Sequence, residues 1–178
     1  MESGFECVSA RELAAVKSFS GQKIFNSCAS SDEEIKEALA QNALIILDSL
    51  SHAEQVSRLS PMKPLSVGLR VRMDNHRFGF SPNEIRKTIE HLATVGLQVV
   101  VLHGHPGTSG TLNSYKNFIS RFAQVVREYP FLLGVDIGGG LPGRTSLIER
   151  KEKIEQYAVL ILEHLGEFLR TRVLYVEP

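Results

Sequence analysis

The chain has 178 residues, 43% of them hydrophobic, and is therefore long enough to form one domain with a substantial core. Lysine plus arginine and aspartate plus glutamate number 20 each, so no net charge attracts nucleic acid or an anionic membrane, and a small-molecule ligand is favoured. Two cysteines are too few for a disulfide framework, no secretory signal is recognisable, and no apolar stretch approaches the roughly 20 residues that cross a bilayer, which together predict a cytoplasmic protein with reduced thiols.

Short apolar segments alternate with amphipathic ones from one end of the chain to the other. The apolar segments predict seven strands, at residues 5–8, 23–26, 43–48, 65–72, 97–102, 132–137 and 172–176. Six helices are predicted between them: one that begins after Ser9, then 32–41, 51–59, 82–95, 112–129 and 147–169. Ser9 and Glu12 have the spacing of a capping box, and Ser51 is the predicted start of the third helix.

Such strict alternation predicts right-handed crossovers and a parallel sheet with both faces covered, in one domain over residues 1–178. The sheet is either open and doubly wound or closed into a barrel. Distinctive residues at the carboxyl ends of many different strands favour the barrel; they are Asn26, Asp48, Arg70, His103, Gly138 and Glu177. A complete barrel has eight strands, so we expect a partial TIM barrel without its first strand and the following helix.

Candidate ligand-binding residues lie at the ends of two predicted strands. Residues Val99–Gly107 form an apolar run that reaches His103 and His105 and then breaks into a loop. At Gly138–Gly140 a strand opens into three glycines, whose N–H groups could surround a phosphate, although a flexible loop fits equally well. The two histidines have no third ligand at suitable spacing, so we expect no metal site and a structural role is their simpler interpretation.

Six short motifs occur in order over nearly the whole chain. They are Gly4-Phe5-Glu6-Cys7-Val8-Ser9 with Glu12, Leu69-Arg70-Val71, Arg77-Phe78-Gly79, His103-Gly104-His105-Pro106-Gly107-Thr108, Val135-Asp136-Ile137-Gly138-Gly139-Gly140 and Val176-Glu177-Pro178. Together they resemble the motifs of the fold-III pyridoxal-phosphate-dependent decarboxylases, the family of diaminopimelate, ornithine and arginine decarboxylases. The resemblance implies an alanine-racemase-like α/β barrel, strands two to eight, that binds pyridoxal 5′-phosphate and serves amino-acid metabolism such as lysine or polyamine biosynthesis.

The resemblance also implies roles for individual residues. His105 would stack on the pyridine ring of the cofactor, and Glu177 would face the ring nitrogen and keep it protonated. Arg70 would lie near the cofactor, and His103 would have no direct role. The cofactor phosphate would be held by hydroxyl and N–H donors of Thr108, Gly138, Gly139 and Gly140.

The sequence departs from the family pattern at several points. In the family a lysine on the first barrel strand forms a Schiff base with the cofactor, and no lysine of this chain takes that place, so no catalytic residue is assigned. The C-terminal β-domain, which completes a partner subunit's site, is also absent from the 178 residues. Glu6 stands where the family has aspartate, and Pro106 stands where it has an apolar residue.

We therefore expect a decarboxylase-like barrel that is inactive alone, either a piece of a complete enzyme for a small amino-acid substrate or a non-catalytic relative that acts as a binding or regulatory module. A homodimer or a complementing chain could complete it, because an unclosed barrel leaves sheet edges open. The paired-histidine form His-x-His at His103 and His105 resembles the diaminopimelate branch. A phosphate-binding barrel of another chemistry is a third alternative.

Overall fold

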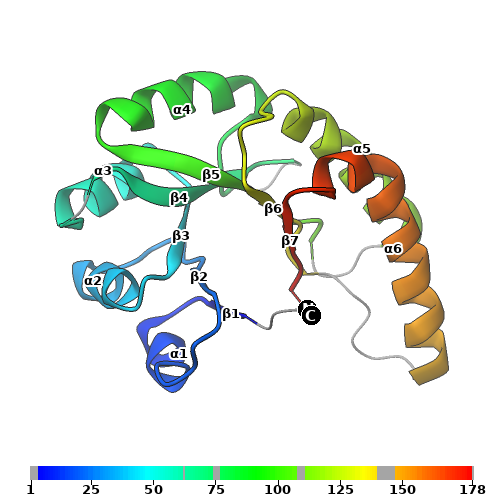
Figure 1. Cartoon of the computed structure of the whole chain (residues 1–178), viewed down its shortest axis with the longest axis horizontal. Coiled ribbons are helices and arrows are strands. Elements are labelled where there is room, and N and C mark those ends of the chain that lie inside the picture. Colours follow the sequence, from blue (N-terminus) through cyan, green and yellow to red (C-terminus); the bar gives the residue numbers. More distant parts are fainter. Residues whose placement is uncertain (1–3, 62, 74–76, 108–110, 140–146, 178) are drawn as a thin grey trace.

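A computed structural model describes residues 4–61, 63–73, 77–107, 111–139 and 147–177 of the chain. In these residues seven strands alternate with six α-helices (Figure 1). The strands are β1 (Phe5–Cys7), β2 (Lys23–Phe25), β3 (Leu44–Leu47), β4 (Leu65–Val71), β5 (Leu97–Gly104), β6 (Gly134–Asp136) and β7 (Val173–Tyr175). The helices are α1 (Ala10–Ala15), α2 (Asp32–Ala40), α3 (Leu50–Leu59), α4 (Ile85–Thr94), α5 (Leu112–Arg127) and α6 (Leu147–Leu169), with a 3₁₀ turn, η1 (Pro82–Glu84), leading into α4.

The strands form one parallel sheet in the order β1 to β7, so each strand pairs with its neighbours in sequence. Figure 1 shows the sheet curving through the centre of the molecule with the helices on its outer side. Among the described residues β1 pairs only with β2 and β7 only with β6, which leaves the sheet open between its two ends. This is the partial (β/α) barrel that the alternation predicted.

Two layers of apolar side chains follow from the period of two along each strand. The larger lies between the sheet and the helices, where Phe25 and Leu102 of the strands pack with Ile35 and Phe122 of α2 and α5. Each of these side chains is fully buried, a burial that stabilises the fold by roughly 1.5–3 kcal/mol per residue. The smaller layer faces the inside of the curve and consists of Ile24, Leu44, Ile46, Val100 and Val101, with Tyr175 against it.

Side-chain caps begin the helices close to the predicted positions. Ser31 accepts the Glu34 N–H at 3.2 Å while the Glu34 carboxylate accepts the Ser31 N–H at 3.0 Å, which forms a complete capping box for α2. At α1, Ser9 accepts the Glu12 N–H, but the Glu12 carboxylate accepts the N–H of Val8.

Several predicted boundaries differ from the observed ones by one to three residues, among them the start of α3 and the end of β5. Helix α3 is capped by Ser49, which accepts the His52 N–H at 3.3 Å, so the helix begins before Ser51. Strand β5 continues two residues past Leu102 and ends at Gly104. His103 is therefore an interior residue of the strand.

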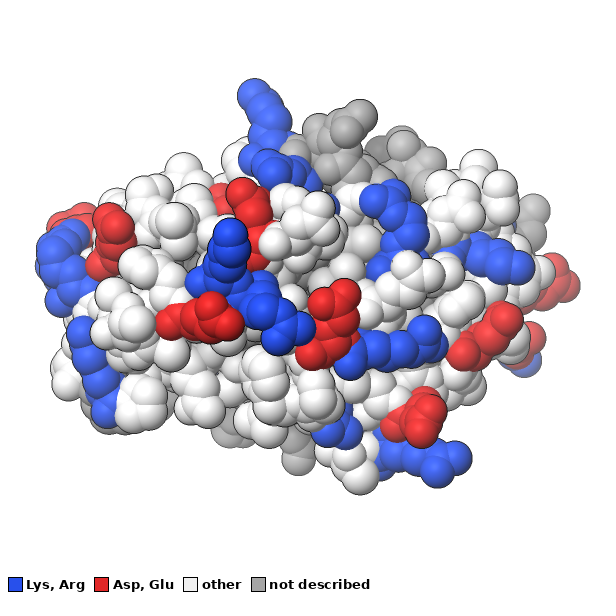
Figure 2. Space-filling model, turned by 90° about the horizontal axis from the view of Figure 1, so that it is seen from above, with Lys and Arg blue, Asp and Glu red and all other residues white. Residues whose placement is uncertain are grey.

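The surface carries both signs of charge side by side. On the face seen in Figure 2, lysine and arginine side chains are interspersed with aspartate and glutamate, and neither sign gathers into a patch. None of the helices in the described residues is long and apolar enough to cross a membrane.

Candidate functional site

At the carboxyl ends of the strands, the side chains on the inner face of the sheet are polar. The pairing register places Arg70 of β4 beside His103 of β5, His103 beside Asp136 of β6, and Asp136 beside Tyr175 of β7. His103 and Asp136 are both completely buried. Residues at matched positions of neighbouring parallel strands point to the same face, so these side chains meet inside the curve.

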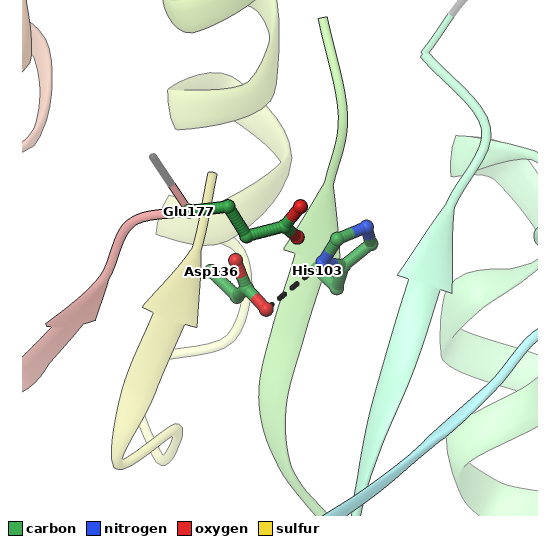
Figure 3. A group of neighbouring side chains, drawn as sticks. All are labelled: His103, Asp136 and Glu177. Carbon is green, nitrogen blue, oxygen red and sulfur yellow. Dashed lines mark ion pairs between the residues drawn. The ribbon is translucent and has the colours of Figure 1, made fainter. Parts of the chain in front are cut away.

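His103 and Asp136 lie against each other in the interior, with His103 Nδ1 and Asp136 Oδ2 3.0 Å apart. Neither atom contacts another hydrogen-bonding group of the described residues. The other carboxylate oxygen, Asp136 Oδ1, accepts the N–H of Gly138 at 2.9 Å. Figure 3 shows the pair on adjacent strands, with the Glu177 side chain extending from the end of β7 toward His103.

Asn26, which follows β2, joins His103 to β1. Its amide nitrogen donates to Glu6 Oε1 at 2.8 Å and lies 3.5 Å from His103 Nε2. Glu6 in turn hydrogen-bonds to the carboxyl group of Glu177, which brings the two end strands of the sheet into contact through their side chains.

Burial, the hydrogen bond to Glu6 and the charges of Glu6 and Asp136 raise the pKa of Glu177 to about 9, although Arg70 acts in the opposite direction. Glu177 therefore carries a proton at neutral pH. Its backbone N–H donates to the carbonyl of Gly138 at 3.1 Å. Its Oε1 atom is buried and has no hydrogen-bond partner among the described groups.

These contacts close a circle, which we call the polar ring. Its members are Glu6, Asn26, His103, Asp136, Gly138 and Glu177. They come from or directly follow β1, β2, β5, β6 and β7. The ring thus depends on the curvature of the sheet, which brings its first and last strands together.

Gly138 makes a turn that only glycine fits. Its φ of +61° is in the left-handed region, and a Cβ at this position would lie 2.6 Å from His105 Cδ2. The backbone of Gly138 therefore lies directly against the His105 ring, whose Nδ1 accepts the N–H of Gly107 at 2.9 Å. Gly139, the next residue, is buried.

Arg70 completes the described site on the β4 side. Its guanidinium group lies 3.7 Å from Cys28 Sγ and 5.8 Å from the centre of the Phe78 ring, and its charge favours ionisation of Glu177. Arg70, His105, Gly138 and Glu177, all predicted from the sequence, are therefore gathered around the polar ring. Thr108 and Gly140, which were predicted as phosphate ligands, lie outside the described residues.

Sequence reasoning did not assign Glu6, Asn26 or Asp136 to the site. The signal that could have found them is the alternation along and across the strands: Asn26 lies two residues after the inward Ile24, Glu6 pairs with Ile24, and Asp136 pairs with His103. Sequence reasoning also found no third ligand for a metal. The structure places one ligand atom from each of His103, Asp136 and Glu177 within 4.8 Å of one another, but a protonated Glu177 would first have to lose its proton.

Comparisons with known proteins agree on the fold. Residues 3–134 match the family of the alanine racemase N-terminal domain. Over 155 residues the chain is 30% identical to the diaminopimelate decarboxylase of Deinococcus radiodurans, an alignment that covers 77% of this chain and 40% of the relative.

Solved structures with the same fold include diaminopimelate decarboxylase from Helicobacter pylori complexed with L-lysine (TM-score 0.82, 20% identity, 99% of this chain and 51% of that one). Another is arginine decarboxylase from Paramecium bursaria Chlorella virus bound to agmatine (TM-score 0.81, 21% identity, 98% and 50%). A third is lysine/ornithine decarboxylase from Vibrio vulnificus complexed with putrescine (TM-score 0.79, 23% identity, 99% and 50%). The chain thus spans between 40% and 51% of the length of these relatives.

Proposed function

Because the chain belongs to the alanine racemase N-terminal domain family, we propose that it is the cofactor-binding barrel of a pyridoxal-phosphate-dependent amino-acid decarboxylase of the diaminopimelate, ornithine or arginine type. The observation that carries the proposal is that Glu177 and Gly138 are neighbours in the polar ring, with the Glu177 N–H donating to the Gly138 carbonyl. Glu177 presents a buried carboxyl oxygen that has no hydrogen-bond partner among the described groups, and Gly138 forms a turn that packs on the His105 ring.

The residues present fit pyridoxal 5′-phosphate at both of its ends. A protonated pyridine nitrogen would supply the donor and the positive charge that Glu177 Oε1 lacks, which favours an ionised Glu177. The half-buried His105 ring would contact the face of the cofactor. The Gly138 N–H is donated to Asp136 Oδ1 and fixes the turn, so the phosphate would be held by N–H groups that follow, at Gly139 and at Gly140, with the Thr108 hydroxyl; Gly140 and Thr108 lie beyond the described residues.

The bound cofactor supplies an electron sink for the carbanion that remains when carbon dioxide leaves an amino acid. The chain's own residues orient it and adjust its charge. Glu177 keeps a proton at the ring nitrogen, and Arg70 limits the accumulation of negative charge from Glu6, Asp136 and Glu177. Burial of His103 and Asp136 beneath the site keeps water away from its base.

The positions of the lysines indicate that the 178 residues bind the cofactor but do not catalyse decarboxylation by themselves. All of them are described, and each lies on a helix, in a turn or loop, or at the amino end of a strand; they are Lys17, Lys23, Lys36, Lys63, Lys87, Lys116, Lys151 and Lys153. Catalysis in this class needs a lysine amine at the cofactor. A complementing chain, a homodimeric partner or a further part of the protein would have to supply it.

The same observation supports a second candidate, a non-catalytic relative that keeps the barrel as a binding or regulatory module. The open reading frame around the coding sequence distinguishes the two. An upstream strand bearing a lysine, followed downstream by Gly-Arg and a β-domain, would support the decarboxylase, whereas a start and a stop codon at the two ends would support the module. Among substrates we favour diaminopimelate, because of the His103-x-His105 form and the 30% identity to one such enzyme.

Direct binding tests the proposal. Purified chain is titrated with pyridoxal 5′-phosphate, followed by cofactor fluorescence, then treated with borohydride and digested for mass spectrometry. We expect saturable binding, no lysine adduct, and no release of carbon dioxide from diaminopimelate, ornithine or arginine. Failure to saturate would refute the cofactor site, and a reduced adduct at one specific lysine would refute non-covalent binding.

A further inference from the structure

The hydrogen bonds around His103 determine where its proton lies. The amide nitrogen of Asn26 carries two hydrogens, of which one points to Glu6 Oε1 and the other to His103 Nε2. His103 Nε2 must then act as an acceptor and carry no hydrogen. The ring proton is consequently on Nδ1, the nitrogen that lies 3.0 Å from Asp136 Oδ2.

This arrangement gives Nε2 a donor and places Nδ1 3.0 Å from a carboxylate oxygen. A second proton, on Nε2, would face the N–H of Asn26 and break the contact at 3.5 Å. Because His103 is completely buried, water cannot replace a lost partner. The surrounding groups therefore favour a ring proton on Nδ1 over one on Nε2.

His103 is also the only described group on Asp136 Oδ2, and the orientation of that carboxylate affects the glycine turn. With Oδ2 held by His103, the second oxygen accepts the Gly138 N–H at 2.9 Å. On its other side, His103 orients the Asn26 amide that holds Glu6, the partner of Glu177. One buried imidazole thus lies between the glycine turn and the carboxyl pair.

We propose that His103 is the positioning residue of the cofactor site: through Asp136 it fixes the Gly138 turn that would receive the phosphate, and through Asn26 and Glu6 it fixes Glu177 where it would face the pyridine nitrogen. The role rests on the proposed function. His103 does not contact the cofactor in this scheme, so its effect passes entirely through hydrogen bonds of the polar ring.

The tautomer gives a test that needs no cofactor. Long-range proton–nitrogen NMR spectra of the uniformly labelled chain distinguish a protonated ring nitrogen from an unprotonated one. We expect a protonated Nδ1 and an unprotonated Nε2 for His103, and an amide resonance of Gly138 that shifts in His103→Leu. An Nε2-protonated or doubly protonated ring would overturn the proposal.

Paired ligands test the positioning itself. Pyridoxal 5′-phosphate and pyridoxal differ only in the phosphate, so the ratio of their affinities reports on the glycine turn. In His103→Leu we expect phosphate-bearing ligand to bind about 10- to 100-fold more weakly, the equivalent of one lost hydrogen bond to a charged group, and pyridoxal to lose much less. His103→Asn, which retains an N–H donor near the position of Nδ1, should restore most of the affinity for the phosphate form.

His52→Leu is the matched control. His52 is likewise buried and paired with a carboxylate, with Nδ1 3.2 Å from Asp48 Oδ1, but it lies on α3 outside the polar ring. We expect His52→Leu to be less stable than the unaltered chain but to keep the same ratio of affinities for pyridoxal 5′-phosphate and pyridoxal. If His103→Leu resembles His52→Leu in its ligand ratio, or if His103→Asn rescues nothing, the positioning role is wrong. If the unaltered chain binds neither ligand, both the proposed function and the positioning role of His103 are wrong. The NMR experiment still determines the tautomer of His103 in that case.

Discussion

Replacement of Gly138 by alanine tests the contact on which the glycine turn depends. Two costs are expected. Residue 138 has a φ of +61°, and a non-glycine residue in the left-handed region loses about 1–2 kcal/mol. The new Cβ would lie 2.6 Å from His105 Cδ2 and 3.2 Å from the Gly104 carbonyl oxygen, and such overpacking adds about 1–3 kcal/mol. Gly138→Ala should therefore lower the free energy of unfolding by roughly 2–5 kcal/mol.

Gly96→Ala separates the two costs. Gly96 also has a left-handed φ, +77°, but the nearest atom to its Cβ would be Cδ of the exposed Lys63 side chain, which can move aside. Only the backbone cost of about 1–2 kcal/mol is expected there. Urea unfolding followed by circular dichroism measures both variants, with equal slopes required before the free energies are compared.

The affinity for pyridoxal 5′-phosphate provides the second measurement. Gly138→Ala should weaken binding because His105 and the N–H groups of the turn both shift, whereas Gly96→Ala should leave it unchanged. Equal losses of stability in the two variants would show that His105 does not pack on Gly138. An unchanged affinity in Gly138→Ala would show that the turn does not hold the ligand.

Three further substitutions test other parts of the structure. The pKa of Glu177 is raised from 4.5 to about 9, so the stability of the folded chain falls as pH rises between these values. The melting temperature of Glu177→Gln should therefore rise relative to that of the unaltered chain as pH increases. A difference in melting temperature that stays constant with pH would contradict this. Ser31→Ala should cost about 1 kcal/mol in urea unfolding through loss of the cap on the Glu34 N–H, and no loss would exclude the capping box. Phe122→Ala, which empties a fully buried position against Gly104, should cost about 3–5 kcal/mol, whereas less than about 1 kcal/mol would mean that α5 does not pack as described.

The order and type of the elements could be predicted because hydrophobic period and capping residues coincide along the chain. The end of β5 could not, because the apolar run stops at Leu102 while the ladder continues through His103 to Gly104. A buried histidine needs polar neighbours, and those of His103, Asn26 and Asp136, come from other strands. The choice of Ser49 over Ser51 likewise depends on backbone angles that two nearby serines do not reveal.

The candidate site was predictable where short motifs resemble those of the decarboxylase family. The resemblance assigned Gly138 and Glu177 to the cofactor, and both lie in the polar ring. Glu6 and Asn26 carry no such signature, because a single carboxylate or amide at a strand end is common. Their importance arises from the curvature of the sheet, which brings β1 and β7 close enough for Glu6 to contact Glu177.

The charges of the site explain why a single ligand could bind at both ends of the site. The carboxylates of Glu6 and Asp136 and the carboxyl of Glu177 outnumber the single guanidinium of Arg70, so this end favours a cationic group and resists a second anion. At the other end, N–H donors of the glycine run that begins at Gly138, whose own N–H is donated to Asp136, would favour an anion. A molecule with a protonated aromatic nitrogen at one end and a phosphate at the other matches this polarity, whereas inorganic phosphate alone matches only the glycine end. Binding of pyridoxal 5′-phosphate should therefore exceed the sum of what pyridoxal and phosphate achieve separately, provided His103 keeps the two ends in register.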